Sequence, residues 1–277
     1  MTDDMFSITH AFREAMKQLP KGPEELANAD GKRLRQELDV LMTELNARAR
    51  LLDPTSHPDS FFDPADPRLF GIFAALALVG LDRQPLMSVK DRKFYGSGVY
   101  ALYYNGPFPT YQPIARTEHP IYVGKADPEL PDARSPRQQG ERLSARLNEH
   151  RKNIERAENL NLADFECRYL VVATGWQTAA ESALIGLFKP IWNKEIGILL
   201  GFGKHGDSAE TRRNKRSPWD VLHTGRRWAA SDTLKDSKTP QQIELEVQAH
   251  FAKNAPVTDI QHIVKELIKQ VGAVRTP

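Results

Sequence analysis

The sequence predicts an α+β fold in which a small three-stranded sheet is flanked by helices. Three short segments are rich in β-branched and aromatic residues, as expected for strands: 98–104, 121–125 and 165–174. In the remaining segments, apolar residues recur every three or four positions, which is typical of amphipathic helices. The chain has 277 residues, of which 40% are hydrophobic and 27% charged, and this composition is globular.

The first 85 residues are predicted to form a helical arm. Its strongest helix spans 32–52, where apolar residues recur at helical spacing: Leu34, Leu38, Leu41, Met42 and Leu45. A proline-rich loop over 53–67 separates this helix from a second apolar helix over 68–81. The arm carries no catalytic constellation, so we expect it to pack on the core or to wrap a ligand or partner. Two amphipathic helices, 239–252 and 257–271, are predicted to close the chain.

The composition also excludes several classes of protein. No apolar run approaches the roughly 20 residues that a membrane-spanning helix needs, and the acidic N-terminus lacks the apolar core of a signal peptide. Cys167 is the only cysteine, so no intrachain disulfide forms, and no Cys/His cluster has the spacing of zinc ligands. We therefore expect a bacterial-type cytoplasmic protein with no membrane partner.

Basic residues are unevenly distributed, although the net charge is only +2. Residues 134–156 contain seven Lys and Arg against three Glu, and residues 204–227 contain seven against three acids. Either run alone is most simply a solvated face. Two such runs on either side of a candidate site favour a groove that follows the phosphates of a nucleic acid.

Two tyrosines lie on strands that are bounded by glycine. Tyr100 ends the triplet Gly98-Val99-Tyr100, and Tyr122 begins Tyr122-Val123-Gly124, which Lys125 follows. The loop between the two strands, 105–120, contains four prolines, so it is not a tight hairpin turn.

The helix predicted over 142–158 places Arg146 one turn before His150, so the two side chains share a face. Both residues also have simpler interpretations. His150 falls within the apolar stripe and is then a hydrogen-bonded core histidine. Arg146 is then a surface arginine paired with Glu149.

Glu181 borders the apolar stripe of a helix predicted over 178–188. With Thr178 it has the spacing of a capping box, in which the carboxylate has a structural role. The alternative is a metal-binding carboxylate, because a carboxylate on the buried side is costly unless it is paired or bound to a cation. Asn193 is likewise either a turn residue or a member of the same site.

Taken in order, these residues resemble the GIY-YIG nuclease family. Both triplets carry valine in place of the middle isoleucine, and the spacing between them exceeds that of the small homing and repair members. The chain is instead similar to the branch of GIY-YIG type II restriction endonucleases with an insertion between the triplets. Further phrases extend this resemblance over roughly residues 90–254: GVYALYY, PIYVGKA, ExALI, KPxWN, GFGxH and WDVxHxGRxWA.

The resemblance implies an antiparallel sheet and hydrolysis of a DNA phosphodiester with one divalent metal. Glu181 would hold Mg²⁺, the expected cofactor, and Tyr100 would act as general base toward the attacking water. Tyr122 would support the phosphate or the water, and Arg146 would bind the scissile phosphate.

The remaining three implied roles are supporting ones. His150 would orient the reacting groups, and Asn193 would fix the environment of the phosphate. A tyrosine titrates near about 10, so a tyrosine base needs nearby positive charge. Lys125 would lower the tyrosine pKa for this purpose, together with Arg146 and Mg²⁺.

The resemblance also implies the partners. Enzymes of this kind cut both strands of a palindrome with one site per chain, so we expect a homodimer on double-stranded DNA. Members of this branch recognise CCGCGG, in which Arg or Lys would read guanine from the major groove. We expect DNA contacts in the loop 105–120 and from eight later residues: Lys204, His205, Arg212, Arg213, Lys215, Arg216, His223 and Arg226. A cognate DNA methyltransferase is expected in the same system, although not as a bound partner.

Three parts are therefore expected: a helical arm over 1–85, a nuclease core with DNA-contacting insertions over 86–230, and a helical segment over 231–277. Two other functions remain open from the sequence. One is a non-catalytic DNA-binding module in which Glu181 only caps a helix. The other is a repair or mobile-element nuclease that nicks one strand.

Overall fold

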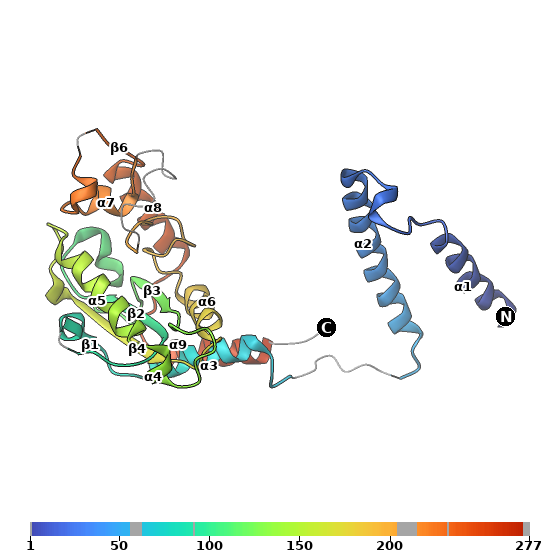
Figure 1. Cartoon of the computed structure of the whole chain (residues 1–277), viewed down its shortest axis with the longest axis horizontal. Helices are drawn as coiled ribbons and strands as arrows, with labels where there is room; N and C mark the ends of the chain where they lie inside the picture. The colour runs from blue at the N-terminus through green and yellow to red at the C-terminus, as the bar shows by residue number, and fades with distance from the viewer. Residues whose placement is uncertain (1, 56–62, 91, 204–214, 232, 274–277) are drawn as a thin grey trace. The chain divides into compact units, whose positions relative to one another are not determined.

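The computed structural model describes residues 2–55, 63–90, 92–203, 215–231 and 233–273. The chain divides into two compact units, Met1–Phe61 and Phe62–Pro277, and each is described by itself (Figure 1). Helix α3, which the sequence analysis places in the helical arm, belongs to the second unit and packs against α6 there.

The first unit consists of helix α1, Thr2–Met16, and helix α2, Asn28–Leu52, with the 3₁₀ turn η1, Pro23–Glu25, between them. The predicted amphipathic helix is thus present as α2. No residue of α2 is buried, and Leu41 of its apolar stripe is 57% exposed. Within the described residues of the first unit, the apolar face of α2 is therefore left exposed.

The second unit contains the sheet and the remaining helices. Its described elements, in chain order, are α3 Pro67–Val79, β1 Gln84–Pro85, η2 Leu86–Lys90, β2 Gly98–Tyr104, η3 Pro109–Ile114, β3 Tyr122–Ala126, α4 Pro136–Gln139, α5 Arg142–Glu155, η4 Leu162–Asp164, β4 Phe165–Val171, α6 Gln177–Phe188, β5 Lys215–Arg216, α7 Pro218–Leu222, η6 Arg227–Ala229, β6 Lys235–Asp236, α8 Pro240–Lys253 and α9 Ile260–Ala273. Among the residues that the structure describes, no helix is long and apolar enough to cross a membrane.

The main sheet has four antiparallel strands in the order β1-β4-β2-β3. The three predicted strands are all present, and the third ends at Val171, three residues earlier than expected. The fourth strand, β1, is only two residues long and contains a proline, so no periodic pattern marks it in the sequence. β5 and β6 form a separate parallel pair.

Strand β2 is buried along its whole length, and its side chains alternate between two apolar clusters. Tyr100 and Leu102 face a cluster that includes residues of α5, α7 and α8. Val99 and Tyr103 face the opposite cluster, to which α3, α6 and α9 contribute. The C-terminal helices α8 and α9 therefore complete the core of this unit, one on each face of the sheet.

The insertion between β2 and β3 is folded against the core. Tyr111 and Ile114 are fully buried, and the Tyr111 hydroxyl accepts a 3.0 Å hydrogen bond from the Trp192 indole. We expected this loop to read DNA. That remains a prediction: the apolar residues of the loop's 3₁₀ turn pack onto the core.

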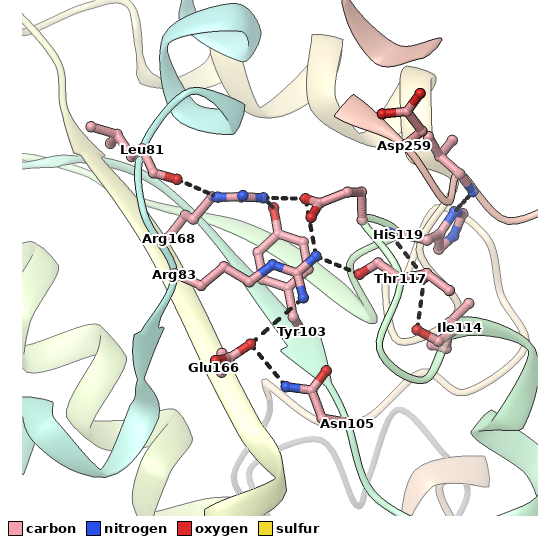
Figure 2. Close-up of polar contacts among 12 residues, drawn as sticks. Leu81, Arg83, Tyr103, Asn105, Ile114, Thr117, His119, Glu166, Arg168 and Asp259 are labelled. Carbon is pink, nitrogen blue, oxygen red and sulfur yellow. Dashed lines mark hydrogen bonds and ion pairs between the residues drawn. The ribbon is translucent and has the colours of Figure 1, made fainter. Parts of the chain in front are cut away.

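The end of the insertion is held by two arginines that meet at Tyr103 (Figure 2). The Arg83 guanidinium lies 4.0 Å from the centre of the Tyr103 ring, and Arg168 donates to the Tyr103 hydroxyl at 3.1 Å. Both arginines pair with Glu118 of the insertion, at 3.0 and 2.7 Å. Arg83 also donates to the backbone carbonyl of Thr117. These contacts fix the chain where it enters β3.

Candidate active site

The tyrosine of the first triplet points from β2 toward α5. The Tyr100 hydroxyl lies 2.6 Å from Nε2 of His150, and both side chains are fully buried. Gly124 is the partner of Tyr100 in the β2–β3 register, and a Cβ atom at this position would collide with the Tyr100 hydroxyl. The glycine of the second triplet therefore makes room for the tyrosine of the first.

Tyr122 and Arg146 complete this cluster. The Tyr122 ring centre lies 6.1 Å from that of Tyr100 and 5.1 Å from that of His150. The Arg146 charge acts on Tyr100 and lowers its pKa, and the Arg146 guanidinium donates to the Glu149 carboxylate at 2.6 Å. Its side chain remains 31% exposed. The structure thus brings four of the seven predicted catalytic residues together, and the pairing of Arg146 with Glu149 exists alongside them.

Both tyrosines are held in their neutral form. Burial raises the pKa of Tyr100 well above its ordinary value, Tyr122 adds to this effect, and Arg146 opposes it. Burial also raises the pKa of Tyr122, again against the effect of Arg146 and with Glu181 adding to it. We expected Lys125 and Arg146 to lower a tyrosine pKa. Arg146 does act in that direction on both tyrosines, but burial outweighs it, so the pKa of each tyrosine remains raised in the protein alone.

Asn193 binds the backbone of β3, the edge strand of the sheet, and Glu181 interacts electrostatically with Lys125 of the same strand. The buried Asn193 amide accepts from the Val123 N–H at 2.9 Å and donates to the Val123 carbonyl at 2.8 Å. Two residues along the strand, Lys125 lies close enough to the Glu181 carboxylate to lower its pKa. Alternate residues of an antiparallel edge strand present their backbone groups outward. Asn193 therefore binds β3 on the side that lacks a neighbouring strand.

The positive charge near Glu181 does not compensate for its burial and for the acids around it. Burial raises its pKa to about 7, Glu195 and Asp127 add to the rise, and Lys125 opposes it. Helix α6 begins at Gln177 and its N-terminus has no side-chain cap. The capping-box interpretation of Glu181 is therefore wrong, because Thr178 lies inside the helix.

Lys125 is engaged with acids. Its Nζ atom lies 2.5 Å from the Asp127 carboxylate, and its charge lowers the pKa of Glu181. The groups that act most strongly on the pKa of Tyr100 are Tyr122 and Arg146. Lys125 therefore interacts with the Glu181 carboxylate rather than with Tyr100.

Phe202 and Gly203 form a wall of the site that the sequence analysis did not identify. The Phe202 ring stacks on His150 with 4.7 Å between centres and 17° between planes, and it meets Tyr122 edge-on at 5.2 Å. A Cβ atom at Gly203 would lie 3.2 Å from an Arg146 guanidinium nitrogen and 3.4 Å from the Tyr122 hydroxyl. The phrase GFGxH carried the only signal, in two glycines flanking an aromatic residue.

Arg226 holds this wall from behind. Its guanidinium is 3% exposed and donates to the Asp220 carboxylate at 2.6 Å and to the Gly201 carbonyl at 2.9 Å. His223 is fully buried, with its two ring nitrogens 2.5 Å from the Tyr111 hydroxyl and 2.8 Å from the Asn159 side chain. We expected Arg226 and His223 to contact DNA. Because protein groups surround both side chains, they belong to the frame of the site.

A family model described as the Eco29kI GIY-YIG domain matches residues 92–251, which is more than half of the chain. The chain belongs to the Eco29kI GIY-YIG family. It therefore carries a restriction endonuclease domain, which implies sequence-specific cleavage of DNA. A search of the curated proteins finds no match to the chain. The matched range of this Eco29kI GIY-YIG domain includes the tyrosine cluster, the β3 edge and the Phe202 wall.

The other DNA contacts expected of this Eco29kI-type domain are only partly visible. Lys204, His205, Arg212 and Arg213 lie outside the described residues. Lys215 is exposed on β5, and Arg216 is half-buried, with its Nε atom 3.3 Å from the Asp236 carboxylate. Of the predicted DNA-contacting residues that the structure describes, Lys215 is therefore the one that is exposed to solvent.

Divalent metal is typical of GIY-YIG nucleases, so we asked whether this Eco29kI-type site fits one. Among the described residues, no group of three or more His, Cys, Asp and Glu side chains forms a metal cage. Mg²⁺ commonly uses one or two carboxylates, several waters and the oxygens of a bound phosphate. Glu181, partly buried and flanked by the acids Glu195 and Asp127, is a donor of that kind. The residues present are therefore compatible with a divalent metal ion held by one carboxylate.

Proposed function

We propose that this protein is a type II restriction endonuclease that hydrolyses phosphodiester bonds of double-stranded DNA with one Mg²⁺ ion. The observation that carries the proposal is the convergence of a tyrosine–histidine pair, a partly exposed arginine and a carboxylate beside one strand edge. The Tyr100 hydroxyl lies 2.6 Å from Nε2 of His150, and the Arg146 charge acts on the same tyrosine. Glu181 acts electrostatically on Tyr122.

Tyr100 is the proposed base, and it acts through His150. A buried tyrosine with a raised pKa does not ionise on its own near neutrality. The hydroxyl instead gives its proton to Nε2 of His150 as it takes one from the attacking water. No tyrosinate accumulates, and the positive charge develops on an imidazole that Phe202 holds in place.

Arg146 and Tyr122 are the proposed phosphate ligands. Their polar ends both approach the position above Gly203, where a Cβ atom would lie within 3.4 Å of each. The guanidinium is partly exposed, so a phosphate oxygen can reach it from solvent. A donor pair in this position stabilises the negative charge that grows on the phosphate in the transition state.

Glu181 is the proposed Mg²⁺ ligand, and Asn193 is a positioning residue. Bound Mg²⁺ would neutralise charge on the scissile phosphate and on its leaving oxygen. The Asn193 side chain binds the backbone of Val123, which lies between Tyr122 and Gly124. Asn193 thereby fixes the position of β3 relative to Tyr100. Lys125 balances the charge of Glu181 before the cation binds.

The biological assembly is proposed to be a homodimer on DNA. One site of this kind per chain cuts one strand, and a palindrome supplies two equivalent strands to two equivalent chains. Eco29kI itself cuts CCGCGG, and we propose a GC-rich palindrome of this type as the target. The cognate DNA methyltransferase would act separately on the same sequence.

Digestion of a sequenced plasmid in Mg²⁺, with run-off mapping of both ends, tests this function. We expect linear product with ends at one palindrome and the same stagger on each strand. Nicked circles without linear product would replace the restriction function with strand nicking. Salt-sensitive DNA binding without any cleavage would reduce the protein to a binding module.

A further inference from the structure

A second site lies behind the Phe202 wall. A cavity of about 540 Å³ is lined by Arg156, Gly225, Arg226, Arg227 and Trp228. We call it the arginine cavity. Its volume falls within the roughly 300–1,000 Å³ that is usual for small-ligand sites.

The arginine cavity carries uncompensated positive charge. Arg226 is neutralised by Asp220 at 2.6 Å, but Arg156 and Arg227 are exposed. Neither of these two forms an ion pair with another residue in the described part of the chain. Among the residues that the structure describes, no carboxylate lines the cavity. The guanidinium groups of Arg156 and Arg227 line the same cavity without a paired acid, and such a pair can bind a ligand that carries a phosphate group.

The walls of the cavity are locked together by backbone contacts. Gly225 has a φ of +113°, and a Cβ atom there would collide with the Arg156 carbonyl oxygen. The Glu158 N–H donates to the Thr224 carbonyl at 2.9 Å. The Thr224 hydroxyl in turn donates to the Glu158 carboxylate at 2.6 Å. This nearby acid is therefore engaged by the loop itself, and the cavity is formed before any ligand binds.

The arginine cavity is also connected to the active site. Arg226 donates to the Phe202 carbonyl at 3.4 Å, and Phe202 stacks on His150. The Arg226 guanidinium lies between two indole rings, 4.4 Å from the centre of Trp219 and 5.5 Å from that of Trp228. Trp228 is half-buried and lines the cavity, so it offers an apolar surface beside the two free arginines.

We propose that the arginine cavity binds a backbone phosphate of the DNA strand close to the scissile one. Arg156 and Arg227 would bind the phosphate oxygens, and Trp228 would contact the adjoining sugar. This inference rests on the proposed function, since it assigns part of the same DNA to the cavity. Phosphate contacts position a duplex without reading its sequence. The cavity would thus fix the register of the DNA relative to Tyr100 and Arg146.

Binding measured without cleavage tests this assignment. The double variant Arg156→Gln/Arg227→Gln and the wild type are titrated with a fluorescent duplex in EDTA over a range of KCl concentrations. We expect the variant to bind more weakly by about tenfold or more at low salt. The slope of log K against log salt should fall by about 1 to 2, for both target and unrelated sequences. Arg156→Lys/Arg227→Lys retains the charge and should retain most of the binding.

The matched control is Lys253→Gln/Lys265→Gln, which removes two exposed charges elsewhere in the same unit. It should leave the slope within experimental error of the wild type. An unchanged slope in the arginine variant would overturn the proposal, and so would a loss confined to the target sequence, which would mean base readout. Wild-type protein that binds no DNA at all would instead refute the proposed function.

Discussion

The Tyr100 hydroxyl and Nε2 of His150 are joined by a 2.6 Å hydrogen bond inside a fully buried pair. The two side chains are proposed to relay one proton from the attacking water. Removing either the Tyr100 hydroxyl or the His150 imidazole should therefore disable the same step. We expect Tyr100→Phe and His150→Gln each to lower the single-turnover cleavage rate by about 10²–10⁴-fold. The double variant should be no slower than the slower single variant, because residues that act as a unit are not additive. Rate losses that multiply in the double variant would contradict the relay.

Glu181→Gln should change stability with pH in a defined direction. The pKa of Glu181 is raised to about 7 by burial, so the folded protein holds this proton more tightly than the unfolded chain. Wild-type stability therefore falls as the pH rises from about 4.5 to about 7. Without Mg²⁺ at pH 8, the free energy of unfolding of the variant should exceed that of the wild type by about 1–2 kcal/mol, after allowing for the partial exposure of Glu181. Urea unfolding at pH 8 and pH 5 measures the difference, and a benefit that is equal at both pH values would refute this environment for Glu181.

Mg²⁺ binding should weaken as the pH falls below about 7, because a proton then competes for the Glu181 carboxylate. We expect the Mg²⁺ concentration for half-maximal cleavage to rise about tenfold per pH unit in that range. Thermal protection by Mg²⁺ in the absence of DNA should follow the same trend and should vanish in Glu181→Gln. Protection of that variant equal to wild type would place the cation elsewhere.

Gly203→Ala is a one-carbon probe of the phosphate position. The added Cβ would lie 3.2 Å from Arg146 and 3.4 Å from the Tyr122 hydroxyl, so it narrows the site without touching the core. We expect cleavage to fall about tenfold or more, with the melting temperature nearly unchanged. Gly186→Ala, whose Cβ meets nothing within 4 Å, is the control and should cleave normally. Equal rates for the two variants would show that no phosphate binds against Gly203.

Asn193→Ala should destabilise the edge strand. It removes both side-chain hydrogen bonds from the Val123 backbone, at 2.9 and 2.8 Å, in a buried place. Leaving the buried N–H and carbonyl unpaired costs about 1–3 kcal/mol each, so we expect about 2–4 kcal/mol in urea unfolding. Hydrogen exchange at Val123 should accelerate by more than at Leu102 on the neighbouring strand β2. Equal acceleration at both amides would mean that Asn193 stabilises the unit without holding this edge.

The three strands and the order of the site residues followed from local patterns. Residues 98–104, rich in tyrosine and with valine and leucine, have a strong preference for strands, and the spacing of Arg146 and His150 defines one helical face. Such features depend on neighbours in the chain. The two-residue strand β1 depends on pairing with β4 alone, so it left no pattern in the sequence.

Burial across long distances in the chain was harder to predict. His223 and Arg226 look like surface cations in a basic segment, but their partners Tyr111, Asn159 and Asp220 enclose them in the folded unit. The same effect governs the tyrosine pKa values, in which desolvation outweighs the nearby charge of Arg146. A sequence shows which charges are present, whereas their energies depend on how much water the fold leaves beside them.

Cleavage of one supercoiled plasmid by wild type and Glu181→Ala, in Mg²⁺ and at matched DNA occupancy, tests the central claim most directly. We predict that wild type converts the plasmid to linear DNA with ends at a single palindrome. We predict that Glu181→Ala binds the same DNA but leaves it supercoiled. Linear product at an undiminished rate from Glu181→Ala would contradict the account, because the proposed Mg²⁺ ligand would then be dispensable.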